Sequence, residues 1–276
     1  MNSPRSWSLP PVKRARLLLV MVPLLGGCGV ELKPGAESIL EAFGSELSPS
    51  DLAAMSIDPY DANNRYRGTL GLASAYFANE PVYIALFEAN IDDTDPAVRM
   101  AATRGLANHG EPRHVPLLLT SLADPNKIVR LEAARGLQRL HDAAAVGPLI
   151  DALREPRGEL KAPSEAEPEV RAEAADALGQ YAELRVVHEL VAALDDSDLA
   201  VNDAALRSLR TLTGQDFGVD RATWADWLSR TQAPFAGRGL YTYPAYRREM
   251  RFYEYIPFVP KPRNEVAAPP AGLPRG

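Results

Sequence analysis

A five-residue phrase that returns four times between residues 95 and 209 constrains the fold of this chain more than any other feature. The copies are Val98-Arg99-Met100-Ala101-Ala102, Val129-Arg130-Leu131-Glu132-Ala133, Val170-Arg171-Ala172-Glu173-Ala174 and Val201-Asn202-Asp203-Ala204-Ala205. Their first residues lie 31, 41 and 31 positions apart. A short, nearly fixed period is the signature of a stacked-repeat architecture in which each unit packs on its neighbours. The longer middle interval predicts an insertion at residues 154–169, placed in a surface loop.

The spacing inside each unit predicts two amphipathic helices. Counting from the first Val, residues at offsets 0, +4 and +8 are apolar and share one helix face. A Leu pair at offsets +20 and +24 predicts the second helix of three units, with the pairs Leu118 and Leu122, Leu149 and Leu153, and Leu190 and Leu194. Small residues occupy offset +7, which predicts a close approach of neighbouring helices. They are Gly105, Gly136, Ala177 and Ser208.

Helix starts and a first, divergent unit can also be predicted. Asp95, Asp124 and Asp198 precede first helices and are expected to cap them. Tyr66-Arg67, lying 32 residues before Val98, is expected to be a divergent copy of the phrase. Ser50-Asp51 is expected to cap a short helix that ends near Asp58.

The motifs of the repeat resemble HEAT repeats of the PBS-lyase type. The likeness rests on the Asp-Pro-x-Val-Arg opening, the Ala-Ala-x-x-x-Leu core and the short turn before a second helix, as at residues 141–149. It covers residues 60–213 and implies an all-α fold, an α-solenoid of stacked helical hairpins. Bacterial proteins with such repeats serve mostly as binding scaffolds or subunits, although some relatives are bilin lyases. No residue in this chain points to a pigment.

The repeats are followed by two further segments. Residues 214–231 resemble the closing segment of HEAT-repeat proteins from planctomycete-like bacteria, with Trp224, Trp227 and Leu228 covering the end of the stack. Residues 232–276 alternate aromatic side chains with prolines and basic residues, which predicts an irregular tail, extended or packed along the repeats. A peptide or membrane-interface contact through the aromatic residues is the alternative.

The N-terminus has the pattern of a lipoprotein export signal. Residues 1–27 combine a basic start with a short apolar core. Leu25-Gly26-Gly27-Cys28 resembles the lipobox of bacterial lipoproteins, which implies lipid on the Cys28 sulfur and a mature chain that begins there. Residues 28–59 then form a tether and an N-terminal helical segment. A buried free Cys, or an ordinary secreted protein cut elsewhere, is the alternative; Gly29 after the Cys favours the outer membrane over the inner one.

The charge of the exported chain excludes some partners. Loss of residues 1–27 would remove four positive charges and change the formal net charge from −6 to −10. Nucleic-acid binding depends on Lys and Arg that neutralise phosphates, so an acidic chain argues against it.

Two sets of arginines are the candidate surface residues. Arg104, Arg135 and Arg207 at offset +6 are candidates for binding an acidic partner. The alternative is structural, since Arg99, Arg130 and Arg171 at offset +1 are expected to pair with turn carboxylates of the neighbouring unit in a stacking ladder.

No catalytic motif is present, and no cofactor or metal is predicted. His188-Glu189 lacks the second His of a zinc-protease helix, since Ala192 takes its place. The acidic runs at 92–95 and 195–198 are interpreted as turns and caps rather than calcium loops. We expect a lipid-anchored scaffold of the cell envelope that binds another envelope protein, with no small-molecule substrate. The alternatives are an enzyme or metal-dependent factor that uses His109, His114 and His141, and a purely structural spacer.

Overall fold

The described part of the chain is built from paired helices. The computed structural model describes residues 47–156, 164–243, 250–257, 259 and 267–274. Its helices are α2 (Pro49–Ser56), α3 (Ala62–Ala73), α4 (Pro81–Asn90), α5 (Pro96–His109), α6 (Val115–Leu122), α7 (Lys127–Leu137), α8 (Val146–Leu153), α9 (Pro168–Leu178), α10 (Leu184–Ala193), α11 (Leu199–Thr213) and α12 (Arg221–Arg230). Three 3₁₀ turns accompany them, η1 (Pro112–His114), η2 (Ala143–Ala145) and η3 (Phe252–Tyr255). Within these residues, every helix is too short or too polar to span a bilayer.

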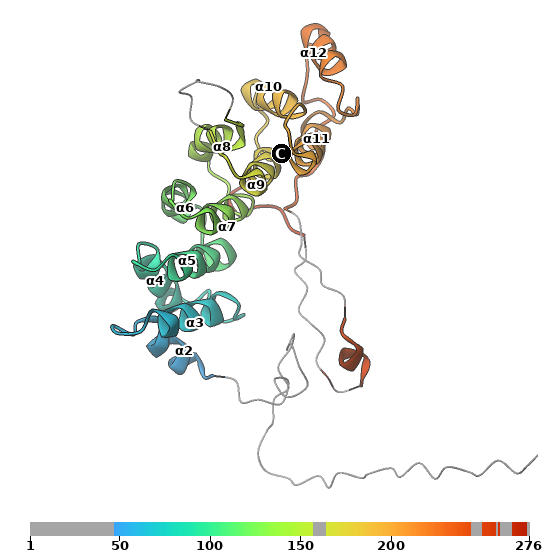
Figure 1. Ribbon diagram of the computed structural model, residues 1–276. Helices are drawn as coiled ribbons and strands as arrows, with labels where there is room; N and C mark the ends of the chain where they lie inside the picture. The colour runs from blue at the N-terminus through green and yellow to red at the C-terminus, as the bar shows by residue number, and fades with distance from the viewer. Residues whose placement is uncertain (1–46, 157–163, 244–249, 258, 260–266, 275–276) are drawn as a thin grey trace, which may run out of the picture.

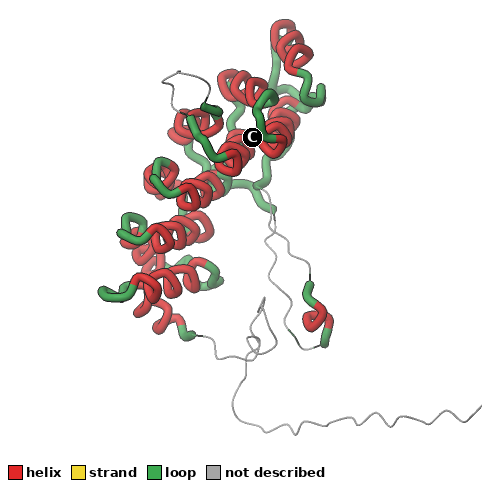
Figure 2. The backbone as a smooth tube through the Cα atoms, in the orientation of Figure 1, coloured by secondary structure: helices red, strands yellow, loops and turns green. Residues whose placement is uncertain are grey.

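The helices form two layers of a curved solenoid (Figures 1 and 2). The first helices α3, α5, α7, α9 and α11 pack successively on one another, while α4, α6, α8 and α10 form the second layer. Figure 1 shows the first helices on the inner side of the curve, where the described parts of the C-terminal tail also lie. The predicted all-α solenoid is thus confirmed.

The repeated apolar offsets form the core, as predicted. Val, Ala and Leu at offsets 0, +4 and +8 are buried in all four units, and so are the Leu pairs at +20 and +24. The small residues at +7 are required by close packing: a Cβ on Gly105 would lie 2.4 Å from the Phe87 ring. Each unit therefore buries its apolar stripe against the next one, as a solenoid requires.

The first unit has a different register from the one predicted. Arg65, and not Arg67, holds the offset +1 position because it pairs with Asp93 as the later arginines pair with their partners. Offset 0 is therefore Asn64, two residues before Tyr66, and Gly68 and Leu72 are the buried +4 and +8 residues. Asn64 has no apolar character, so the sequence alone favoured the wrong frame.

Two predicted helix starts also differ in the structure. Asn126 caps α7 by accepting from the Ile128 amide, so Asp124 is not its cap. Ser48 caps α2 in a capping box with Asp51, so the predicted Ser50-Asp51 cap is wrong by two residues. Asp95 and Asp198 cap α5 and α11 as predicted.

The ends of the solenoid are covered by α2 and α12. α2 packs on α3, and α12 packs on α10. Trp224 in α12 is fully buried, its indole N–H donates to the Gly218 carbonyl at 2.8 Å, and its ring meets Phe217 and Trp227 edge-on. Burial of these rings shields the last unit from solvent, as the sequence predicts for residues 214–231. The lipobox lies outside the described residues.

Candidate functional site

The arginines at offset +1 form a ladder that joins successive units. Each donates two hydrogen bonds to a turn carboxylate of the next unit. The pairs are Arg65–Asp93, Arg99–Asp124, Arg130–Glu165 and Arg171–Asp196, with closest N–O distances of 2.6–2.8 Å. Each also donates through Nη1 to carbonyls of the turn before its own helix, as Arg99 does to Asp93 and Thr94. The predicted stacking ladder is therefore present.

The ladder carboxylates also organise the turns that carry them. One oxygen of Asp93, Asp124 or Asp196 accepts the backbone N–H two residues later, which positions the N-cap of the following helix. Glu165 does the same in the insertion, although this loop was predicted to be a surface feature. The insertion thus supplies the ladder with a buried carboxylate. In the last unit, Asn202 replaces Arg and donates to carbonyls of Ala193 and Asp196.

The electrostatics of the ladder favour the ionised carboxylates. Burial acts to raise the pKa of Asp93, Asp124 and Glu165, but hydrogen bonds from the arginines and from backbone amides lower each pKa below its usual value. An arginine beside a carboxylate favours the charged form of both groups. The ladder is thus composed of ion pairs at neutral pH.

The offset +6 arginines pair with carboxylates on the neighbouring first helix. Arg104 binds Glu132, Arg135 binds Glu173 and Glu132, and Arg207 binds Asp176. These arginine side chains nevertheless remain 36%, 46% and 55% exposed. They form a second row of pairs on the first-helix layer, oriented by carboxylates and still accessible to solvent. Their role in partner binding stays a prediction.

The three histidines proposed as an alternative site have separate surroundings. His109 contacts the Ala73 carbonyl and stacks on Phe87, and burial lowers its pKa. His114 accepts the Glu111 amide through Nδ1 and lies 3.1 Å from a Glu88 oxygen. His141 pairs with Gln180 and stacks on Tyr181. Within the described residues, no group of three or more His, Cys, Asp or Glu is placed to hold a metal ion.

Two parts of the C-terminal tail, residues 238–243 and 267–274, bind to the inner side of the solenoid. Gly239 donates to the Thr211 carbonyl, and Tyr241 is buried near Glu173 and Asp176. The Arg139 guanidinium lies 5.0 Å from the centre of the Tyr243 ring, a cation–π geometry. Residues 267–274 bind to the turn after α7 through Ala271. In these two parts the tail packs along the repeats, whereas Figure 1 shows η3 away from the helices.

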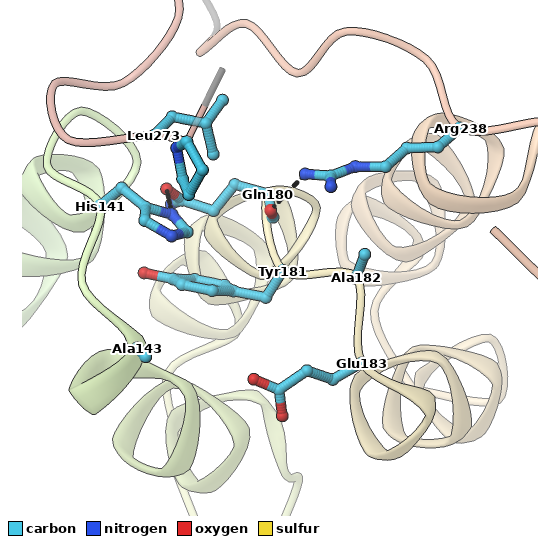
Figure 3. Close-up of a pocket in the computed structure, with 9 residues that line it drawn as sticks. His141, Ala143, Gln180, Tyr181, Ala182, Glu183, Arg238 and Leu273 are labelled. Atoms are coloured by element: carbon cyan, nitrogen blue, oxygen red, sulfur yellow. Dashed lines mark hydrogen bonds between the residues drawn. The ribbon is translucent and has the colours of Figure 1, made fainter. Parts of the chain in front are cut away.

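A small pocket lies where the tail crosses the turns after α7 and α9 (Figure 3). Its volume is about 180 Å³. Figure 3 shows His141 above the Tyr181 ring, with Arg238 and Leu273 reaching in from the tail. No pattern in the sequence predicts this pocket, because its walls come from four segments far apart in the chain.

The fold and the ladder define the class of protein: an α-solenoid of helical hairpins stacked through buried ion pairs. Residues 84–165 match the family model of HEAT repeats, and residues 170–196 match that of the PBS lyase HEAT-like repeat. The solenoid therefore contains HEAT repeats over these residues.

Solved structures with similar folds are helical-repeat proteins. The complex of CpcE and CpcF of phycocyanin lyase from Nostoc sp. PCC7120 matches with a TM-score of 0.53 and 23% identity, covering 73% of this chain and 74% of that chain. A designed armadillo repeat protein in complex with a (KR)4 peptide matches with a TM-score of 0.49 and 19% identity, covering 67% and 90%. No curated protein matches the sequence. At these identities the likeness shows the fold alone.

Proposed function

We propose that this protein is a lipid-anchored scaffold of the bacterial cell envelope that binds an acidic segment of a partner protein on its inner face. The supporting observation is a row of two arginines, Arg104 on α5 and Arg135 on α7. Each is ion-paired with a carboxylate of the next first helix, and the two side chains are still 36% and 46% exposed. Arg67 is an exposed residue of α3, in the same first-helix layer. These guanidinium groups are partly exposed cations in a chain whose formal net charge is −6.

The pairing of these arginines favours binding without a large ordering cost. Glu132 and Glu173 hold the guanidinium groups in place, so less side-chain entropy is lost when a partner carboxylate binds. Arginine also offers a planar fork of donors that matches a carboxylate. Tyr241 of the tail is buried near Glu173 and Asp176 on α9, so the α3–α7 part of the inner face is the proposed contact.

The proposed function includes no catalytic step. The three histidines lie in separate contacts, and the phycocyanin lyase components share only the fold with this chain. Metal analysis of the purified protein would test the alternative of a metal-dependent factor: a stoichiometric bound metal that is lost in His109→Ala or His141→Ala would support that alternative over a scaffold.

The partner surface can be tested by site-specific cross-linking in intact cells. A photo-reactive side chain at position 67 reports on the inner face, and one at the exposed His188 of α10 is the matched control on the second layer. We expect one discrete adduct from position 67, reduced at least several-fold by combined Arg104→Gln and Arg135→Gln substitutions that leave the melting temperature within a few degrees of the parent. An adduct from position 188 alone, or one insensitive to the two substitutions, would contradict the proposed face.

The anchor is a separate part of the proposal and needs a separate test. Each buried lipid CH₂ contributes about 0.8 kcal/mol, so two or more acyl chains hold a protein at a bilayer without a spanning helix. We expect labelled palmitate to be incorporated into the wild-type chain and to be absent from Cys28→Ala. Equal labelling of both chains would refute lipidation at Cys28.

A further inference from the structure

The carbonyl groups at offset +10 form a repeated set of acceptors near the ends of the first helices. They belong to Arg139, Gln180 and Thr211 in three successive units. Thr211 is among the last four residues of α11, whose carbonyls have no partner within the helix, and Arg139 and Gln180 lie two residues beyond α7 and α9. All three carbonyls therefore need donors from elsewhere. Here the tail supplies all three donors: the Ala271 amide at 2.8 Å, the Arg238 guanidinium at 2.8 Å and the Gly239 amide at 2.7 Å.

The turn after α7 is paired with the tail as a strand edge pairs with an added strand. The Arg139 carbonyl accepts from the Ala271 amide, and the His141 amide donates to the Ala271 carbonyl at 2.8 Å. Leu140 and Ala271 thereby form a parallel bridge. This is the main-chain recognition seen when an extended peptide adds to an exposed edge, where the backbone gives affinity and side-chain pockets give specificity.

The side chains on both sides of this bridge fit the shape of the edge. Pro270 is buried, and Leu273 and Pro274 line the pocket formed with His141 and Tyr181. Gly272 has a φ of +86°, and a Cβ there would lie 2.7 Å from Pro112 Cγ and 2.9 Å from the His141 carbonyl. The site therefore accepts an extended segment with a small residue followed by an apolar one.

We infer that this edge, made of the turns after α5, α7 and α9, is a binding site for extended peptides of the Pro-Ala-Gly-Leu-Pro type, and that residues 267–274 are its resident ligand. Prolines limit the conformations of the free segment, so binding it costs less entropy. Charge also favours the contact, because residues 232–276 carry seven Arg and Lys against three Glu in an otherwise acidic chain. The edge is separate from the arginine face of α3–α7, so the inference does not depend on the proposed acidic partner.

A single substitution in the full-length protein can empty the site. Gly272→Val places a branched side chain against Pro112 and the His141 carbonyl, whereas Gly147→Ala, where an added Cβ meets nothing within 4 Å, is the matched control. The probe is a fluorescein-labelled synthetic peptide with the sequence of residues 267–276. The apparent dissociation constant of a site that is free only part of the time rises by the inverse of the free fraction. We expect Gly272→Val to bind the peptide about tenfold or more tightly than wild type, and Gly147→Ala to match wild type.

Two further measurements make the result decisive. A peptide carrying Ala271→Pro lacks the N–H that donates to Arg139, so it should fail to bind the Gly272→Val protein. Hydrogen exchange of the His141 amide should be slow in wild type, fast in Gly272→Val, and slow again when the parent peptide is added. An Ala271→Pro substitution in the chain provides a second route to the emptied site without touching the helices. No peptide binding to either emptied protein, equal binding of the two peptides, or fast His141 exchange in wild type would overturn the inference.

Discussion

At the scale of single residues, two buried tyrosines near the tail differ in the hydrogen bonding of the hydroxyl group. The Tyr181 hydroxyl donates to the Asp142 carbonyl at 3.0 Å, whereas the buried Tyr241 hydroxyl has no hydrogen-bond partner among the described residues. Burial raises the pKa of both phenols, so both are neutral at physiological pH. A buried polar group without a partner costs desolvation energy that a satisfied one recovers.

This contrast predicts opposite effects of the same small substitution. Tyr181→Phe loses a hydrogen bond and should lower the free energy of unfolding by about 0.5–1.5 kcal/mol, leaving a carbonyl unpaired. Tyr241→Phe removes an unsatisfied hydroxyl and should leave the free energy of unfolding unchanged or raise it by up to about 1–3 kcal/mol. Urea unfolding of the two variants beside wild type measures both values. A Tyr241→Phe variant less stable than Tyr181→Phe would show that the Tyr241 hydroxyl is bonded in solution.

At the scale of the element, the ladder connects each inter-helix turn to the next unit. Asp124 binds Arg99 of the preceding unit and the Asn126 amide of its own turn, so one carboxylate fixes the stacking and the start of α7. Asp93, Asp124 and Glu165 have pKa values below their usual range. A carboxyl group whose pKa is lowered by folding stabilises the folded state. This stabilisation is complete above the pKa of the unfolded chain, about 3.9 for Asp and 4.3 for Glu, and is lost as the pH falls through the pKa of the folded state.

The ladder therefore predicts acid sensitivity with a definite sign. The contribution of the ladder carboxylates to the free energy of unfolding should be nearly constant from pH 7 to pH 5 and should fall as the pH drops below about 4. Asp124→Asn should lower this free energy at pH 7 by about 1–3 kcal/mol and flatten its decline at acidic pH, because one of the shifted carboxyls is gone. Asp92→Asn, at an exposed neighbouring aspartate, is the control. If the free energy of unfolding declined as steeply at acidic pH in Asp124→Asn as in wild type, the role given to Asp124 would be contradicted.

The elements also show what could be read from the sequence and what could not. Periodic offsets predicted the paired helices, their buried Val, Ala and Leu residues and the Arg99–Asp124 type of contact, because these follow from helix geometry and a fixed repeat. The register at Asn64 and the return of Glu165 from the insertion were missed, because both depend on contacts between units rather than on local pattern. The tail site was missed for the same reason, since backbone carbonyls recur in every unit whatever the side chains are.

At the scale of the whole molecule, stability is a sum of units and of the interfaces between them. α7 contacts α5 on one side and α9 on the other, so it joins the two halves of the stack. In such a nearly one-dimensional protein, damage to a central interface uncouples the units on either side instead of abolishing all of them together. The tail opposes this uncoupling, because its described residues bind to units from Arg139 to Thr211.

Leu137→Asp places a charge in the centre of this arrangement. The Leu137 side chain is fully buried in α7, and an unpaired carboxylate there should destabilise the protein by more than about 4 kcal/mol. We expect calorimetry to show a lower melting temperature and a transition that splits in two, as the units before and after α7 unfold separately. Leu199→Asp, at an 81% exposed leucine before the last clear unit, is the matched control and should melt within a few degrees of wild type. A single transition at the wild-type temperature in Leu137→Asp would be incompatible with the stack, since it would mean that α7 carries no central interface.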